Sequence, residues 1–260
     1  MSVLVPKSQA FFFSSDTSSG ARNVSTDGSK FTIYLDTPIS LPQAAMNATI
    51  EVSQASIWNV SYNISADFAN NNFNFVSGIA YDLTIPDGLY SLSGLNAYLA
   101  TQFVNLGFPA NLIVISGDDA TQKTILTFLN AGDQVDFTQP NSVREILGFN
   151  SRIVTSASAG FNEFSDSTAA FNRVNSYLIK STLVSQGLNI NNIGAGVIAS
   201  VPITVSPGSQ INYQPRNPIP IDASELVGQS KNAFTFSLLD QSLRPAPTAG
   251  ELYNFVVIFR

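Results

Sequence analysis

The chain is 260 residues long, enough for one large β domain with an insertion, and only 12% of it is charged, against about 25% in an average domain. It contains no cysteine and no histidine, which excludes disulfides, thiolate chemistry and the commonest general base and transition-metal ligand. The formal charge is -6 and the 12 Lys and Arg residues are scattered singly, so the chain has no basic stripe for direct nucleic-acid binding.

Asn, Ser, Thr and Phe are abundant and long helical patterns are few, which favours strands joined by polar loops. No run approaches the ~18 consecutive apolar residues of a membrane span. The N-terminus also lacks the basic and hydrophobic segments of a signal peptide. We therefore expect a mainly β protein with no transmembrane segment, made without a signal peptide.

The first 29 residues are interpreted as an N-terminal arm. Phe11, Phe12 and Phe13 are followed by the polar stretch SSDTSSG, which has little to bury. Two interpretations stay open, a mobile arm anchored by its phenylalanines and an arm that docks on a neighbouring subunit.

Strands are predicted next. Alternation from residue 30 to 35 indicates a strand with one buried face. From residue 49 the apolar residues fall on even positions, but Ile57 is out of step. We therefore expect one long strand, bent near residues 54–57 by a bulge, that contributes to two sheets. The Asn triplet at 70–72 predicts a turn before a further strand.

Residues 79–149 have a different rhythm and predict an inserted lobe of strands and helices. Ser91 is the N-cap candidate of a helix whose apolar face would hold Leu92, Leu95, Leu99, Phe103 and Leu106. Two short strands follow at 112–115 and 124–129. The spacing of Ser142 and Glu145 fits a capping box, and Gly148 would end that second, short helix.

Residues 150–173 show no strong period and are interpreted as a linker. Five strands are then predicted, at 174–184, 196–205, 210–213, 233–239 and 251–260. The last has apolar side chains on both faces, Tyr253, Phe255, Val257 and Phe259 on one and Leu252, Val256 and Ile258 on the other. We therefore expect it to lie inside a β-sandwich sheet with both faces covered.

No residue is predicted to be catalytic, to bind a cofactor or to ligate a metal. Asp118 and Asp119 could offer oxygen ligands to Ca²⁺, but the EF-hand spacing is absent and a solvated hairpin tip fits better. Glycoside hydrolysis would need two converging carboxylates, and nothing in the sequence brings a pair of the 18 acidic residues together.

Three other features could be interpreted as functional sites, but each has a simpler structural or chance explanation. The sequons at Asn23, Asn47, Asn59 and Asn63 fit chance matches in an Asn- and Ser-rich chain without an export signal. The glycines at 194 and 196 lack the strand-to-helix setting of a nucleotide loop. Trp58, the single tryptophan, is expected in the core rather than on a ligand platform.

Short segments spread in order along most of the chain carry a family likeness. They read IPDGLYS at residues 85–91, SVREILGF at 142–149, NSYLIKSTLV at 175–184, IASVPI at 198–203 and QINYQP at 210–215, with Phe234, Ser237, Leu239, Asp240 and Gln241 before the last strand. In this order they resemble the penton (minor capsid) proteins of virophages, Polinton-like viruses and their relatives.

That resemblance implies an antiparallel jelly-roll β-sandwich whose five copies close each vertex of an icosahedral shell. It implies a virion protein, a homopentamer beside the major capsid protein, and no enzymatic activity. The sandwich would comprise residues 1–78 and 150–260, with an inserted α+β lobe at 79–149. A β-sandwich carbohydrate- or receptor-binding module, of the fibre or spike kind, is the alternative, and a glycoside hydrolase stands third.

Overall fold

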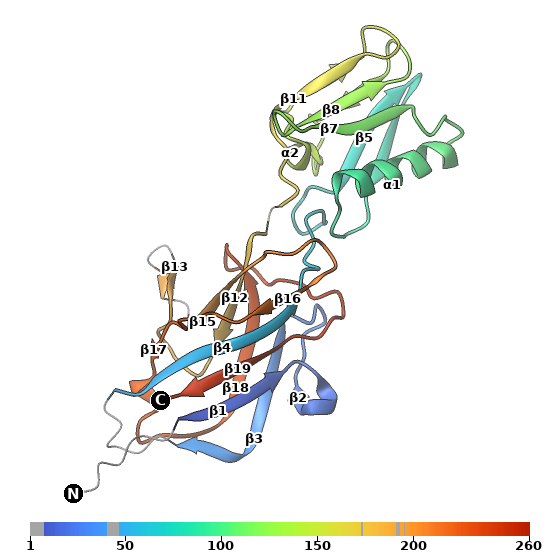
Figure 1. Cartoon of the computed structure of the whole chain (residues 1–260). Helices are drawn as coiled ribbons and strands as arrows, with labels where there is room; N and C mark the ends of the chain where they lie inside the picture. The colour runs from blue at the N-terminus through green and yellow to red at the C-terminus, as the bar shows by residue number, and fades with distance from the viewer. Residues whose placement is uncertain (1–7, 41–46, 173, 191–192, 195) are drawn as a thin grey trace, which may run out of the picture. The chain divides into compact units, whose positions relative to one another are not determined.

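The computed structural model describes residues 8–40, 47–172, 174–190, 193–194 and 196–260, and the chain divides into two compact units. The first combines Met1–Ser61 with Val174–Arg260, and the second is Tyr62–Arg173. Figure 1 draws the strands and helices of each unit and labels most of them.

The first unit contains two antiparallel sheets that share one core. The β19 sheet runs in the order β1 (Gln9–Ser14), β19 (Asn254–Phe259), β4 (Thr49–Trp58) and β16 (Gln210–Tyr213), and β17 (Ile221–Asp222) also pairs with β4. The β18 sheet runs in the order β15 (Val197–Pro202), β12 (Ser176–Ser181), β18 (Ser230–Asp240), β3 (Lys30–Ser40) and β2 (Ala21–Arg22). The smaller elements are the hairpin of β13 (Asn189–Ile190) with β14 (Ile193–Gly194) and the 3-10 turn η2 (Ser224–Leu226).

Phenylalanine rings from both sheets meet in the core of the sandwich. The ring of Phe236 in β18 lies 4.7 Å from that of Phe13 in β1 and 4.9 Å from that of Phe255 in β19, measured between centroids. Phe31 of β3 lies 5.4 Å from the same Phe236 ring. Because such aromatic pairs add about 0.5–1.5 kcal/mol each beyond the burial of their area, this cluster holds the two sheets together.

Residues 9–22 belong to the sandwich and do not form a separate arm. β1 pairs along its whole length with β19, and Phe13 is buried between the sheets. The 3-10 turn η1 (Thr17–Ser19) then leads to β2. The expected arm over residues 1–29 is wrong for this stretch. Burial of the Phe13 side chain between the sheets is favourable by about 1.5–3 kcal/mol relative to its exposure to water, which stabilises the pairing of β1 with β19. Residues 1–7 lie outside the described ranges.

β4 contains the irregularity that its sequence predicts. Its buried apolar residues fall on even positions up to Val52 and on odd positions from Ala55. The register against β19 skips Ser53, which is therefore the extra residue of a bulge and puts Ile57 out of step. The strand nevertheless stays in one sheet, contrary to expectation, since its partners β16, β17 and β19 all belong to the β19 sheet.

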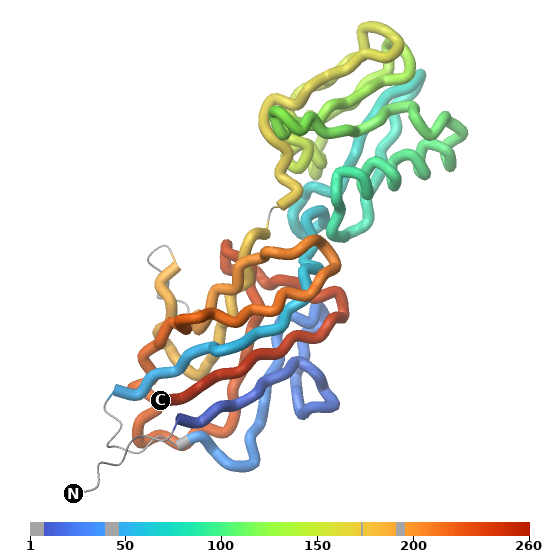
Figure 2. The backbone as a smooth tube through the Cα atoms, viewed as in Figure 1, coloured from blue at the N-terminus to red at the C-terminus, as the bar shows by residue number. Residues whose placement is uncertain are grey.

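β19 lies inside its sheet, between β1 and β4, as the C-terminal sequence predicts (Figure 2). The side chains buried on its inner face are Tyr253, Phe255, Val257 and Phe259. On the outer face Val256 and Ile258 are only half-buried, and Leu252 is 49% exposed. The expectation that both faces are covered is therefore wrong within the described chain, and the sheet keeps an apolar outer face.

The second unit holds two further antiparallel sheets. One runs in the order β10 (Ile153–Thr155), β9 (Gln134–Asp136), β5 (Asn72–Ser77) and β6 (Ile79–Thr84), and the other in the order β11 (Asn162–Thr168), β8 (Lys123–Phe128) and β7 (Ile113–Asp118). Phe75 of β5 packs 5.1 Å from Phe103 in the core of this unit. The unit starts at Tyr62, earlier than the lobe expected at 79–149, because the inward side chains of β5 pack in the core of this unit.

Two helices complete this unit. α1 (Leu92–Asn105) begins as predicted, with Ser91 Oγ accepting the Gly94 N–H at 3.0 Å, and it buries Leu95, Leu99 and Phe103. α2 (Arg144–Leu147) ends at Gly148 as predicted, but its N-cap is Val143, which makes no side-chain bond; the predicted cap, Ser142, lies one residue earlier, and its Oγ accepts the Arg144 N–H at 3.3 Å. Within the described ranges, neither helix has the length and apolar character to cross a membrane.

Residues 150–173 are not a linker. They supply β10 and β11, which pair with β9 and β8 at the ends of the two sheets. β11 has a polar sequence and only one buried residue, Ser165, so it lacks the apolar alternation by which strands are predicted. Backbone pairing and polar contacts hold it instead.

Candidate functional site

The outer face of the β19 sheet is the clearest exposed apolar surface of the first unit. Phe12 of β1 is 62% exposed and lies opposite Val256, and Ala10 lies opposite Ile258 in the next row. Beside this row the buried Glu51 carboxylate binds the Arg260 guanidinium at 2.6 Å. An exposed apolar row of this kind is typical of a protein contact surface. Its signal in the sequence was the second apolar row of the C-terminal strand.

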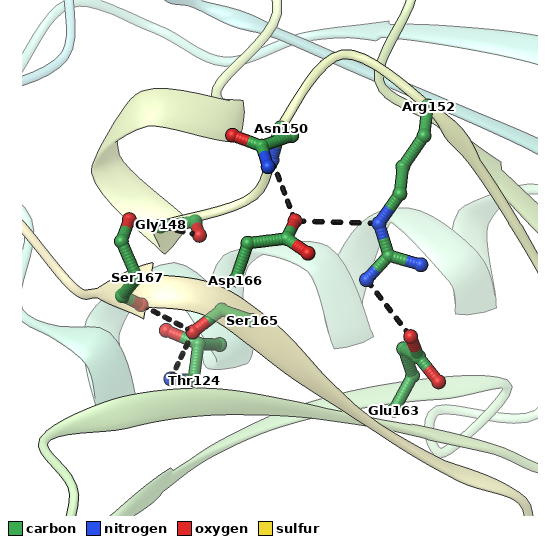
Figure 3. A network of polar contacts seen from close by, with 8 residues as sticks. All are labelled: Thr124, Gly148, Asn150, Arg152, Glu163, Ser165, Asp166 and Ser167. Carbon is green, nitrogen blue, oxygen red and sulfur yellow. Dashed lines mark hydrogen bonds and ion pairs between the residues drawn. The ribbon is translucent and has the colours of Figure 1, made fainter.

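A second site, in the inserted unit, is a polar network around Arg152 (Figure 3). Arg152 Nη2 lies 2.8 Å from Glu163 Oε1, its Nε lies 3.3 Å from Asp166 Oδ2, and its guanidinium sits 5.6 Å from the Phe149 ring centroid. The Asn150 N–H also donates to Asp166 Oδ2 at 2.8 Å. The network therefore fastens the segment after α2 to β11.

The hydroxyl groups of Ser165 and Ser167, also in β11, form further hydrogen bonds beside this network (Figure 3). Ser165 Oγ accepts the Thr124 N–H at 3.0 Å and donates to the Ser167 carbonyl at 2.7 Å. Ser167 Oγ in turn donates to the Gly148 carbonyl at 3.1 Å. Residues far apart in sequence are joined here without any motif, so only the abundance of serine and the clustered charges hint at the network.

The two carboxylates of the network are poor candidates for glycoside hydrolysis. The Asn150 N–H, followed by the positive charge of Arg152, holds the pKa of Asp166 below its usual range. A general acid in that reaction needs a raised pKa, so that it still carries a proton near neutrality. Glu163 Oε1 instead binds the same arginine at 2.8 Å.

Asp118 and Asp119 lie at the tip of the β7–β8 hairpin, as predicted. The Asp118 carboxylate accepts the hydroxyl proton of Thr121 and also its N–H, at 3.2 Å, and these hydrogen bonds lower the pKa of Asp118. The side chain of Gln122 donates to the Asp119 carbonyl at 2.7 Å. Over the part of the chain that the structure describes, no group of three or more acidic residues is placed to hold a metal ion.

The sequons fall into two kinds. Asn59 and Asn63 are buried, and the Asn63 amide donates to the carbonyls of Tyr90 at 2.7 Å and Phe171 at 2.9 Å. Asn23 and Asn47 are exposed. The buried pair is used for internal hydrogen bonds, so their sequons have a structural explanation.

Trp58 and the glycine pair are also placed by the structure. Trp58 is half-buried at the end of β4 and does not belong to the buried core, contrary to expectation. Gly194 lies in the β13–β14 hairpin, and Gly196, at φ 62°, leads into β15, so the setting is a strand approach as expected. Ala195, between them, lies outside the described residues.

The charges of the chain are divided unequally between the units. The inserted unit carries ten Asp and Glu residues against four Lys and Arg, whereas the remainder carries eight against eight. The whole net charge of -6 therefore resides in Tyr62–Arg173, and the sandwich is formally neutral.

Two antiparallel sheets around one core, interrupted by a compact unit of strands and helices, define the class of jelly-roll β-sandwich proteins. The chain shares this fold with the penton protein of mavirus, a virophage, known from a crystal structure of the selenomethionine-labelled protein. The two align with a TM-score of 0.52 over 98% of this chain and 99% of that one, at 10% identity. The resemblance and the jelly-roll fold predicted from the sequence are thereby confirmed. No family model and no curated protein matches the chain significantly.

Proposed function

We propose that this protein is a structural capsid protein that forms the pentameric vertex of an icosahedral shell. The observation that carries the proposal is the alignment with a penton protein over nearly the full length of both chains, inserted unit included. The open apolar face of the β19 sheet supports it, because a vertex subunit must contact its neighbours.

The proposal includes the surroundings of the protein. Five copies would meet each other and the major capsid protein of the same virion, and the chain would be located at the capsid vertex. We further propose that it has no catalytic activity, no cofactor and no metal, and that it does not bind nucleic acid directly. The lack of His and Cys and the carboxylates engaged with Arg152 support a non-enzymatic role.

The mass of the purified chain, measured by native mass spectrometry and light scattering, tests this function. A pentamer is expected, and co-expression with the major capsid protein should yield shells with the chain at the vertices. A trimer would favour a fibre or spike protein instead. A stable monomer that binds a glycan array would favour the carbohydrate-binding module.

A further inference from the structure

Strands at the edge of a sheet expose unpaired backbone groups, and natural proteins blunt such edges with charge, proline, bulges, short length or a cover. The edges of the inserted unit follow this rule. β6 carries the exposed Asp82, β11 carries two acidic residues and a register shift, and β10 has three residues. β7 is covered by α1, where Asn96 Oδ1 accepts the Ile115 N–H at 2.7 Å.

Most edges of the sandwich are blunted as well. β2 and β17 have two residues each, and β2 carries Arg22. β15 ends in Pro202 and is covered at Val197, whose carbonyl accepts the Leu188 N–H at 2.8 Å. Short or covered strands of this kind resist pairing with an unrelated chain. β16 is short, at four residues, but carries neither charge nor proline, so its edge can still pair with a matching strand.

Among the described edges, β1 has none of these protections. Its six residues, QAFFFS, contain no charge and no proline, and its register against β19 runs without a bulge. Phe12 points outward from the sheet and is 62% exposed. An edge with these properties is a template for strand addition.

The alternation of backbone bonds shows which groups of β1 are open. Ser15 donates its N–H to the Tyr253 carbonyl at 2.9 Å, just beyond the end of the ladder. Because hydrogen-bonded pairs alternate in antiparallel strands, the N–H and C=O groups of Phe13 and Phe11 face β19, whereas those of Ala10 and Phe12 face away. Within the described residues, no hydrogen bond joins the backbone of Ala10 or Phe12 to a further element. A groove lined by residues 9–11 of β1 and residues 37–39 of β3 runs beside this edge.

Strand directions identify the complementary edge. β1 is antiparallel to β19, β19 to β4, and β4 to β16, so β16 runs opposite to β1 at the far side of the same sheet. When two copies stand side by side in the same orientation, β1 of one copy meets β16 of the next as an antiparallel neighbour. This contact joins two different surfaces, as a closed ring of five requires.

The distribution of charge also favours a second copy of the chain as the partner of the β1 edge. β16 reads QINY, so neither edge carries a charge, and the sandwich that bears both has eight acidic and eight basic residues. Copies that meet through their sandwiches therefore experience no net repulsion, whereas the inserted units, at ten acidic to four basic residues, repel each other.

We propose that β1 of one copy pairs with β16 of the next, so that the β19 sheet continues from subunit to subunit. This inference rests on the proposed homo-oligomer and names the surface that builds it. Ala10 and Phe12 supply the backbone groups of the new ladder, with Asn212 opposite Ala10 and Gln210 opposite Phe12. The Phe12 side chain covers the junction.

Two variants test the edge without disturbing the sandwich. Ala10→Pro removes an N–H that faces away from β19, and Phe12→Lys places on the edge the residue that natural proteins use to prevent pairing. We expect each to weaken association at least tenfold by analytical ultracentrifugation, equivalent to about 1.4 kcal/mol. Tyr34→Lys is the matched control, because Tyr34 is 56% exposed on the other sheet and should leave association unchanged. Thermal unfolding of each variant reports that the fold is kept.

Cross-linking tests the identity of the neighbour, since the chain has no cysteine of its own. A double variant, Ala10→Cys with Asn212→Cys, should form inter-subunit disulfides under mild oxidation and give a ladder of up to five chains on a non-reducing gel. Opposed residues in neighbouring strands lie about 4.5–5.5 Å apart between Cα atoms, within disulfide range. Each single variant should stay uncross-linked.

The outcomes separate the two proposals. A wild-type pentamer that survives Ala10→Pro and Phe12→Lys overturns the edge pairing and leaves the vertex function standing. Cross-linking of Ala10→Cys alone shows that β1 pairs with itself, which also overturns it. A wild-type chain that stays monomeric at every concentration, alone and with the major capsid protein, overturns the vertex function and the pairing together.

Discussion

Replacing Gly148 by Ala probes how the inserted unit holds its last strand. Gly148 ends α2 at φ 79°, in the left-handed region, and a Cβ at this position would lie 2.3 Å from the Ser167 carbonyl oxygen. The Gly148 carbonyl also accepts the Ser167 N–H at 2.9 Å and the Ser167 hydroxyl at 3.1 Å. The added methyl group must therefore push β11 away from the end of α2.

Two terms give the magnitude. An L-residue in the left-handed conformation costs about 1–2 kcal/mol, and losing two hydrogen bonds costs about 0.5–1.5 kcal/mol each. Gly148→Ala should thus lower the free energy of unfolding of this unit by about 2–5 kcal/mol. Gly160→Ala is the matched control, because Gly160 has φ 74° but nothing within 4 Å of its would-be Cβ. It should cost only the conformational term, about 1–2 kcal/mol.

Urea unfolding followed by far-UV circular dichroism and by hydrogen exchange over residues 144–168 measures both variants. Trp58 is the single tryptophan and lies in the sandwich, so its fluorescence transition should not move and serves as an internal control. Equal destabilisation by Gly148→Ala and Gly160→Ala would refute the reasoning, since it would mean that the approach of Ser167 to Gly148 carries no energy.

Four further results are expected. Leu99→Asp should destabilise the inserted unit by several kcal/mol in thermal unfolding, the order of magnitude for a buried unpaired charge. Val104→Asp should not, because the Val104 side chain is 55% exposed. An unchanged transition for Leu99→Asp would contradict the assignment of Leu99 to the buried face of α1. The pKa of Asp166 is lowered by folding, so its contribution to stability is complete above the unfolded value of about 4 and is lost as pH falls through the folded value. The oligomer should likewise keep its size in light scattering from pH 8 to 5.5, because the chain contains no histidine and ordinary Asp and Glu side chains stay ionised until about pH 4; sharp dissociation near pH 6 would reveal a buried acidic cluster. Added salt should weaken association only modestly, because the proposed contact is uncharged, and collapse of the oligomer would show that ion pairs dominate it. Metal analysis of native protein should find no stoichiometric zinc or copper, and finding either would contradict the metal-free proposal.

Predictions from the sequence are correct where neighbouring residues of one segment determine its structure. α1 combines an N-cap serine with an apolar face, and both are local signals. The two apolar rows of the C-terminal strand predicted its place inside a sheet, and only the inner row is fully buried. The out-of-step Ile57 pointed to a bulge, although the position of the bulge, Ser53, required the register against β19.

Sequence reasoning failed where the partner of a segment lies far away in the chain. The polar segment of β11 becomes a strand through its pairing with β8 and through Arg152, neither of which its own residues reveal. Phe13 gains its buried site from Phe236 and Phe255, more than 200 positions later, so the first strand looked like a loose arm. The network around Arg152 was likewise invisible, because it joins short polar stretches that match no motif.

The hydrogen bond from the Asn63 amide to the Phe171 carbonyl bears on the evolution of the chain. At 2.9 Å it brings the second residue of the inserted unit beside its third-from-last residue, so the unit leaves and rejoins the chain at one place. Units whose ends meet in this way are exchanged with little damage to their host, because a short connection can replace them. The sandwich can therefore keep its fold when the unit between its strands is exchanged, shortened or removed.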